Sequence, residues 1–454
     1  MNPAAPGETT RERAHARDTA ASQPALFGVA GAPGTRLLAG PARSAGTESL
    51  AQHLARLGVL DLDAREPARW REIVRESGLL GRGGAGFSTV TKLDVAASAP
   101  GAPLVVVNAS EGEPASRKDR TLLELRPHLV LDGAALAARA VGADEIVVYL
   151  HREHLRSAAA LDRAVAERGA ADPSGARIRV VDAPARYIAG ETSAVVSYLS
   201  GTGALPQRRA VPVAHTGVAQ RPTVVNNAET LAHLALVGRF GATWFRQAGT
   251  PEAPGSTLIT LTGAVTVPGV VVEVMAPVAL GRVLETIGGL DAVPRAVLLG
   301  GYEGTWLSGE IAWRAPLDRH LLGASGSSLG CGLVAVLAQH ACGLAETSRL
   351  FAWLADQSAG QCGPCVLGLP ALAQLLDDVV AGTARRRDIR ELHELAASVR
   401  GRGACGHPTG AVTLLESALE TFTPELKHHL RGDACTTVSG LGQFPLPRES
   451  MGTP

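Results

Sequence analysis

The chain has 454 residues, with 43 basic and 43 acidic side chains, a formal net charge of zero and 46% hydrophobic residues. A chain of this length usually folds into about two to four domains, and its neutral charge gives no electrostatic reason to expect binding to nucleic acid. No apolar run reaches the roughly 18 residues that a membrane span needs, and no secretory signal is recognisable. We therefore expect a cytoplasmic protein without membrane insertion, which could still lie at the periphery of a membrane complex.

The first half of the chain predicts an α/β domain. Residues 1–50 mix Ala, Gly, Pro, Thr and Arg without periodicity and are expected to form a flexible leader. A short helix from Trp70 leads into a glycine-rich loop, after which apolar strands alternate with helices. The predicted strands are 104–107, 145–150 and 177–181, and the predicted helices between them are 128–141 and 153–168. This alternation is typical of a mainly parallel sheet, whose ligands gather at the carboxyl ends of the strands.

The second half changes character twice. Alternating residues at 256–263 and 267–274, a short helix at 280–287 and a strand at 296–299 suggest a small β-grasp-like module. After Gly332, apolar residues recur at threes and fours and predict a C-terminal helical bundle. Its predicted helices are 333–357, 366–381, 388–400 and 409–421. The predicted domains are 60–240 for the α/β domain, 245–320 for the β-grasp-like module and 325–435 for the bundle, followed by a tail at 436–454.

Two segments of the α/β domain together predict a nucleotide cradle. The loop Gly81-Arg-Gly-Gly-Ala-Gly86 leads into a helix, where backbone N–H groups and the helix dipole favour a phosphate. Asn108, Glu111 and Glu113 follow the first strand and can hydrogen-bond a ribityl chain, an isoalloxazine edge or a ribose. The alternative interpretations are a surface turn for the loop and a solvated acidic loop for the carboxylates.

Two later segments extend this pattern. Tyr187-Ile-Ala-Gly-Glu191 precedes an apolar helix, and Asn226 and Asn227 lie at a predicted junction between strand and helix. The two amides could bind the same ligand. An isolated amide pair can equally form a turn with a helix N-cap.

The cysteines suggest a second site. Cys362-Gly-Pro-Cys365 opens a predicted helix, a position where thiols are reactive or bound to metal. One interpretation is an iron–sulfur site to which the more distant Cys405 adds a thiolate. A second is a thioredoxin-like dithiol, although that motif normally follows a strand, whereas helices flank it here. A third is that these cysteines are inert structural residues. The remaining cysteines, Cys331, Cys342 and Cys435, are expected to be small core residues.

Together these motifs resemble the flavoprotein subunit of NADH:quinone oxidoreductase (respiratory complex I), a family that also supplies flavoprotein subunits of NAD-linked hydrogenases and formate dehydrogenases. The resemblance runs from about residue 70 to about residue 435 in the same segment order. It implies that a nicotinamide nucleotide passes hydride to FMN and that electrons leave singly through a [4Fe–4S] cluster, toward a partner such as ferredoxin or another redox subunit.

The resemblance also implies roles for individual residues. Those implied to hold FMN are Gly81, Arg82, Gly83, Lys92, Asn108, Tyr187, Gly190, Glu191, Asn226 and Asn227. Those implied for NADH or NADPH are Phe87 and Glu113, and the cluster ligands are Cys362, Cys365 and Cys405.

Some positions depart from the family pattern. Ala359 stands where the family has a fourth cysteine, so the chain shows three thiolate ligands. The candidates for the fourth ligand are Cys331, Cys342, Cys435, His407 and water, and a three-iron cluster is the alternative. In the nucleotide pocket, Val95 and Pro212 stand for flanking aromatic residues, Thr192 for a glutamate, Arg117 for an aromatic residue and Ser110 for an aspartate. Each lost stacking ring should weaken nucleotide binding by about 1 kcal/mol.

The sequence therefore predicts an oxidoreductase that moves electrons from NAD(P)H or a protein donor through FMN and an iron–sulfur cluster to a one-electron acceptor. A non-catalytic assembly or sensor subunit with the same fold is the first alternative, because the nucleotide pocket departs from the family pattern. A thiol–disulfide oxidoreductase that uses Cys362 and Cys365 is the second.

Overall fold

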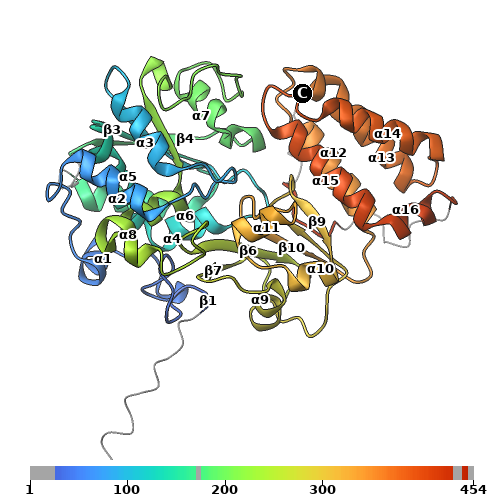
Figure 1. Ribbon diagram of the computed structural model, residues 1–454, viewed down its shortest axis with the longest axis horizontal. Coiled ribbons are helices and arrows are strands. Elements are labelled where there is room, and N and C mark those ends of the chain that lie inside the picture. Colours follow the sequence, from blue (N-terminus) through green and yellow to red (C-terminus); the bar gives the residue numbers. More distant parts are fainter. Residues whose placement is uncertain (1–25, 170–174, 433–441, 448–454) are drawn as a thin grey trace, which may run out of the picture.

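The computed structural model describes residues 26–169, 175–432 and 442–447. The described chain forms an N-terminal α/β part, a central mixed sheet and a C-terminal group of helices (Figure 1). None of the helices in these ranges is long and apolar enough to cross a membrane.

The N-terminal part is built on a four-stranded parallel sheet with the order β4-β3-β2-β5. Its strands are β2 (Leu104–Ala109), β3 (Glu145–Leu150), β4 (Arg177–Asp182) and β5 (Thr223–Asn227). Its helices are α1 (Leu50–Leu57), α2 (Pro67–Ser77), α3 (Thr89–Ser98), α4 (Lys118–Leu125), α5 (Pro127–Val141), α6 (Leu155–Arg168), α7 (Thr192–Leu199) and α8 (Ala228–Phe245), with short 3-10 turns η1 (Arg43–Ala45), η3 (Tyr187–Gly190) and η4 (Val218–Gln220). The strands and helices predicted here are confirmed.

Alternation along the strands explains the two layers of helices around this sheet. Val105 and Val107 of β2 point into the larger core with α5 and α8, whereas Leu104 and Val106 point into a smaller core on the other face with α7. Successive side chains of a strand point to opposite faces, so an all-apolar strand needs cover on both. Helices α5 and α8 approach so closely that a Cβ on Gly133 would lie 1.8 Å from the carbonyl oxygen of Leu231.

The central sheet has six strands in the order β1-β7-β6-β10-β8-β9. They are β1 (Phe27–Gly28), β6 (Thr257–Gly263), β7 (Val270–Val274), β8 (Ala296–Leu299), β9 (Thr305–Ser308) and β10 (Leu333–Leu337), accompanied by helices α9 (Leu280–Thr286), α10 (Gly309–Arg314) and α11 (Arg319–Ala324). Strand β10 runs parallel to β6, and every other pairing is antiparallel.

Strand β10 corrects the predicted helix at 333–357. The strand occupies residues 333–337 and lies between β6 and β8, and the helix starts only at Gly343. All five residues of the strand are buried apolar residues. A short, fully apolar run fits a buried strand as well as a buried helix, so its periodicity could not distinguish the two.

The predicted leader of residues 1–50 is also wrong for residues 26–50. Strand β1 pairs with β7, and Leu37 and Leu38 are fully buried. The buried carboxylate of Glu273 accepts hydrogen bonds from the backbone N–H groups of residues 36–38 at 2.9–3.0 Å. A distant carboxylate therefore fixes a segment that has no periodicity of its own. Residues 1–25 lie outside the described ranges.

The C-terminal part consists of helices around one apolar core that includes Leu350, Leu372 and Leu415. They are α12 (Gly343–Asp356), the π-helical turn η5 (Pro364–Gly368), α13 (Leu369–Val380), α14 (Arg386–Val399), α15 (His407–Thr421) and α16 (Thr423–His429). The helices predicted at 366–381, 388–400 and 409–421 are confirmed, with small differences in their ends. The predicted tail at 436–454 falls mostly outside the described residues.

Candidate functional site

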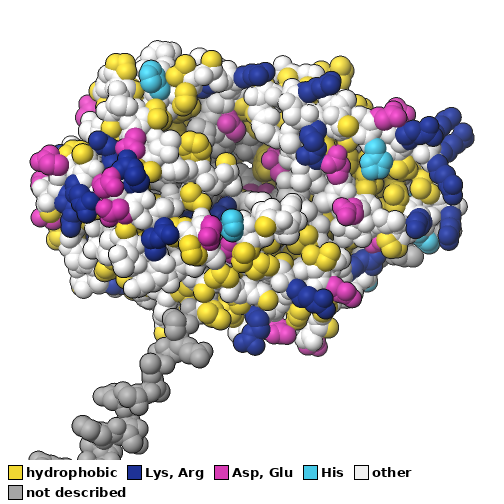
Figure 2. Space-filling view, viewed as in Figure 1, with side chains coloured by type: hydrophobic (Ala, Val, Ile, Leu, Met, Phe, Trp, Pro, Cys, Tyr) yellow, Lys and Arg dark blue, Asp and Glu magenta, His cyan; other side chains and the backbone are white. Residues whose placement is uncertain are grey.

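A cavity of about 830 Å³ lies where the three parts meet. Its wall combines the glycine loop 81–87, the carboxyl ends of β2 and β5, the turn 300–305, the loop 326–331 and the start of α15. The space-filling view shows a hollow between the N-terminal part and the C-terminal helices (Figure 2). The predicted residues that line the cavity are Gly81, Gly83, Phe87, Lys92, Asn108, Glu113, Tyr187, Gly190, Glu191, Asn226 and Asn227. The volume is within the usual range for a small-molecule site.

The glycine loop forms one wall because its backbone turns in ways that only glycine allows readily. Gly84 and Gly86 have φ angles of 123° and 63°, and a Cβ on either would face open space. The N–H of Gly81 donates to the carbonyl of Phe87 at 2.8 Å and closes the base of the loop. The following helix α3 starts only at Thr89, with Ser88 as its N-cap.

Arg82 is the one predicted flavin residue that does not line this cavity. Its side chain is 1% exposed, and Nη2 donates to the carbonyl of Pro254 at 2.7 Å, while its backbone N–H donates to Thr230 Oγ1 at 2.8 Å. Burial lowers the pKa of its guanidinium to about 10. Arg82 therefore anchors the loop to the segment before β6.

Lys92 and Asn226 bring a cation and an amide to the floor of the cavity. Lys92 Nζ donates to the carbonyl of Val225 at 2.9 Å and to Asn226 Oδ1 at 3.2 Å. Burial lowers the pKa of Lys92 to about 8. The buried Nδ2 of Asn226 has no hydrogen-bond partner within the protein. A buried amide donor without a partner costs free energy, so an acceptor on a bound ligand would stabilise this arrangement.

Asn108 and Asn227 lie side by side because β2 and β5 pair in that register. Asn108 Nδ2 donates to the carbonyl of Gly190 at 2.8 Å, which joins the strand end to η3. Asn227 caps α8, so the N-cap interpretation also holds for this residue. Its amide additionally accepts from Lys118 Nζ at 3.0 Å and donates to Asp119 Oδ2 at 2.6 Å.

The buried group around Lys118 was not found by sequence reasoning. Lys118 Nζ lies 3.0 Å from both Asp119 Oδ1 and Glu229 Oε2, and all three residues are buried. Glu229 Oε1 also accepts from the N–H of Leu258, which belongs to the central sheet. This network fixes Asn227 and ties the two sheets together behind the cavity. In the sequence, only the charged residues 117–120 after Glu113 hinted at this buried network.

Glu113 and Phe87 lie at two different depths. Glu113 Oε2 accepts from the N–H of Tyr302 at 2.9 Å, whereas its buried Oε1 has no partner within the protein. Burial raises the pKa of Glu113 to about 8, so this carboxyl is mostly neutral at pH 7. Phe87 is 53% exposed on the glycine loop.

Glu303 and His407 form a link between the cavity and the C-terminal helices. His407 Nδ1 lies 2.6 Å from Glu303 Oε1, and Nε2 lies 2.8 Å from the carbonyl oxygen of Leu354. Both residues line the cavity. Since both ring nitrogens of His407 already have protein partners, the structure does not favour it as a cluster ligand. Glu303 was not predicted, because it lies in an irregular turn far from either motif.

The residues that depart from the family pattern in the predicted nucleotide pocket lie partly inside and partly outside the cavity wall. Val95 packs against the N-terminal core and Pro212 is exposed, and neither lines the cavity. Ser110 and Thr192 do line it. Val95 and Pro212 thus lie outside the cavity wall, and the expectation that they replace stacking aromatic residues stays a prediction.

Two of the three predicted cluster cysteines lie together at the start of η5, and the third is close by. The sulfurs of Cys362 and Cys365 are 3.8 Å apart, and the backbone amide of Ala404, the residue before Cys405, lies next to the thiol of Cys362. Although burial opposes it, hydrogen bonds from backbone amides lower the pKa of Cys362. No group of three or more His, Cys, Asp or Glu side chains in the described ranges is arranged to hold a single metal ion. The ligands of a cluster each bind a different iron.

The other cysteines have different places. Cys342 is buried at the start of α12, as expected, with its sulfur 3.4 Å from His429 Nε2. Cys331 lines the nucleotide cavity, where its thiol donates to the carbonyl of Gly300 at 3.4 Å, so it is not a plain core residue. Cys435 lies outside the described residues.

The residues around the cavity fit FMN. The glycine loop, the unpartnered amide of Asn226 and the cation of Lys92 match the phosphate, hydroxyl and carbonyl groups of a flavin nucleotide. At the second site, three thiols suit an iron–sulfur cluster but do not supply a complete set of four ligands. Fold and sites thus define a flavin and iron–sulfur type of redox protein.

Comparisons with known proteins agree. Residues 74–236 match the Nuo51 FMN-binding domain, and residues 345–429 match the NADH-ubiquinone oxidoreductase-F iron-sulfur binding region. The F subunit of NADH-quinone oxidoreductase in Streptomyces coelicolor is 33% identical over 375 residues, which cover 80% of this chain and 83% of that protein. The Mycobacterium bovis F subunit is 34% identical over 382 residues, which cover 80% and 85%.

A solved structure of an NAD+-reducing [NiFe]-hydrogenase in the H2-reduced state superposes with a TM-score of 0.74 at 32% identity. The match covers 81% of this chain and 63% of the hydrogenase chain. The chain belongs to the family of NADH-quinone oxidoreductase F subunits. It is an NADH dehydrogenase-like oxidoreductase with an FMN-binding domain and an iron–sulfur region.

Proposed function

We propose that this chain takes a hydride from NADH or NADPH and passes electrons one at a time to a protein acceptor, such as ferredoxin or another redox subunit. The main support is that one cavity is lined both by the predicted flavin residues and by His407, which lies two residues after Cys405. FMN, when bound, supplies the conversion from two-electron to one-electron chemistry, and the cluster supplies the exit for single electrons.

The chain's own residues would position the flavin and the nucleotide. Lys92, Asn226 and the N–H groups of the glycine loop would hold the anionic and polar parts of FMN, with Asn108 and Asn227 at the strand ends. Glu113, neutral at pH 7, would hydrogen-bond the nicotinamide nucleotide without repelling its phosphates. The close approach of the backbone at Gly301, where a Cβ would lie 2.9 Å from Glu113 Oε2, keeps this carboxyl in place.

We also propose a division of labour between the parts. The α/β domain would bind FMN and nucleotide, the bundle would carry the cluster, and the central sheet would be a β-grasp-like module that holds them together. Its support is the buried network in which Glu229 joins α8 to β6, together with the contact between Glu303 of the central part and His407 of the bundle.

Anaerobic stopped-flow mixing with NADH and with NADPH tests the proposed turnover. Bleaching of the flavin absorbance would support the enzyme, whereas nucleotide binding without bleaching would support the non-catalytic assembly or sensor subunit. The variant Asn226→Ala should lose flavin because it removes the amide on the cavity floor. Gln374→Ala, an exposed position on α13, is the matched control and should keep flavin at one equivalent per chain.

The pair Cys362 and Cys365 is the observation that favours a thiol–disulfide oxidoreductase as a second candidate. Its sulfurs are 3.8 Å apart, and Cys362 is partly exposed while Cys365 is buried. Replacing both cysteines with Ser separates the two functions. Loss of bound iron supports the cluster. Loss of disulfide reductase activity with unchanged iron content would support the dithiol.

A further inference from the structure

The ligand set of the cluster site is incomplete at one position. Each iron of a four-iron cluster normally takes one thiolate from the protein, and the chain brings Cys362, Cys365 and Cys405 to the site. The backbone amides of Ala359 and Gly360 lie close enough to the thiol of Cys365 to oppose the rise that burial causes in its pKa, so residue 359 borders the thiol pair. Its methyl side chain cannot bind iron.

The candidates Cys331, Cys342 and His407 do not fill this position. Cys331 lies in the wall of the nucleotide cavity, where its thiol bonds Gly300. Cys342 lies at the opposite end of α12 from Ala359, and the helix between them has 14 residues, about 20 Å of length. Both ring nitrogens of His407 are engaged by Glu303 and Leu354.

The gap in the ligand set opens toward solvent. Gly360, Gln361 and Gly363 are exposed, and Ala359 and Cys362 are partly exposed. Water can therefore reach the space beside residue 359. If this position were buried, it would instead need a fourth protein ligand, or apolar side chains that occupy the space.

We propose that the cluster of this chain has one iron without a protein ligand, bound by water at the position of Ala359, and that this iron is selectively removable. The inference rests on the proposed function, since it needs the cluster. Its removal is written as a balanced step: a [4Fe–4S]2+ cluster releases Fe2+ and gives one electron to ferricyanide, leaving [3Fe–4S]+ on three cysteines.

The test uses the full-length chain with FMN and cluster reconstituted without oxygen. After treatment with ferricyanide and EDTA, iron and sulfide are counted per chain, and the spin state is read by electron paramagnetic resonance. The wild type should fall from about four irons to about three and gain the signal of an oxidised three-iron cluster. Ala359→Cys, which restores a thiolate, should keep about four irons, while Ala359→Val, which adds no ligand atom, should behave as the wild type.

Cys435→Ser examines the cysteine that lies outside the described residues, and it should also behave as the wild type. Retention of all irons by the wild type would overturn the inference, and additional iron loss in Cys435→Ser would then identify that cysteine as the ligand. A cluster in Ala359→Cys but none in the wild type would also overturn it, while leaving the fold's capacity for a cluster intact. Absence of iron from every variant would instead refute the proposed function.

Discussion

Lys92 offers a quantitative test of the proposed flavin site. Its ammonium group is held by Val225 and Asn226 on the cavity floor, and burial lowers its pKa from 10.5 to about 8. The cation is therefore present below pH 8 and is lost as the pH rises through this value. We expect FMN affinity to be steady near pH 7 and to fall about tenfold per pH unit above pH 8.

The size of the effect follows from a charge-assisted hydrogen bond. Such a bond contributes roughly 1.5–3 kcal/mol, so Lys92→Met should weaken FMN binding roughly ten- to hundredfold at pH 7. The same variant should show no fall between about pH 7 and 9, since it has no proton to lose there. Lys92→Arg keeps its charge across this range and should also give a flat profile, with affinity closer to the wild type.

The assay is titration of the apoprotein with FMN, followed by quenching of flavin fluorescence at several pH values. Circular dichroism at each pH establishes that the variants stay folded. Parallel pH profiles for the wild type and Lys92→Met would refute the reasoning, because the pH dependence would then come from another group.

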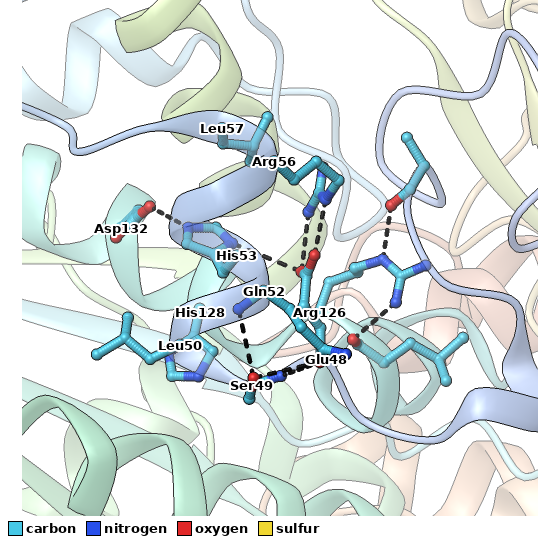
Figure 3. Close-up of polar contacts among 12 residues, drawn as sticks. Glu48, Ser49, Leu50, Gln52, His53, Arg56, Leu57, Arg126, His128 and Asp132 are labelled. Atoms are coloured by element: carbon cyan, nitrogen blue, oxygen red, sulfur yellow. Dashed lines mark hydrogen bonds and ion pairs between the residues drawn. The ribbon is translucent and has the colours of Figure 1, made fainter.

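Three further predictions concern the nucleotide, the stability of the N-terminal part and its helix packing. The neutral form of Glu113 is lost above its pKa of about 8, so the KM for NADH should rise above pH 8 in the wild type and stay flat in Glu113→Gln, as measured by steady-state kinetics. Glu48 is 1% exposed and lies between Arg56 and His53 (Figure 3). Burial alone would raise its pKa, but hydrogen bonds from these two residues outweigh burial and lower the pKa from 4.5 to about 2. The ionised form thus stabilises the fold at neutral pH, so Glu48→Gln should lose about 3 kcal/mol in urea unfolding at pH 6, and the difference from wild type should shrink as the pH falls from 4.5 toward 2. Gly133→Ala should lower the free energy of unfolding by about 2 kcal/mol or more, because the new Cβ would clash with Leu231. Gly323→Ala, which has open space around the new Cβ, should change this free energy little. Equal effects of the two substitutions would contradict the packing argument.

The sequence alone identified the parts of the site whose chemistry is local. Glycine at residues 84 and 86 is required by a positive φ, and the strand ending at Asn108 and the pair Cys362 and Cys365 each depend on a few neighbouring residues. These features are set by backbone sterics, side-chain alternation and motif spacing, all of which act within one element. The α/β alternation and the C-terminal helices after α12 were predictable for the same reason.

Only the tertiary structure decided where the remaining groups point. Arg82 lies within the predicted loop, but its guanidinium bonds Pro254 and turns away from the cavity. Leu333–Leu337 forms a strand because β6 and β8 provide backbone hydrogen-bond partners on both of its edges. Glu303 contacts His407, which is 104 residues away in the chain. Burial, pairing and the exclusion of other ligands around Ala359 depend on residues that are distant in the chain. No local pattern carries that information, because it arises only when the three parts pack against one another.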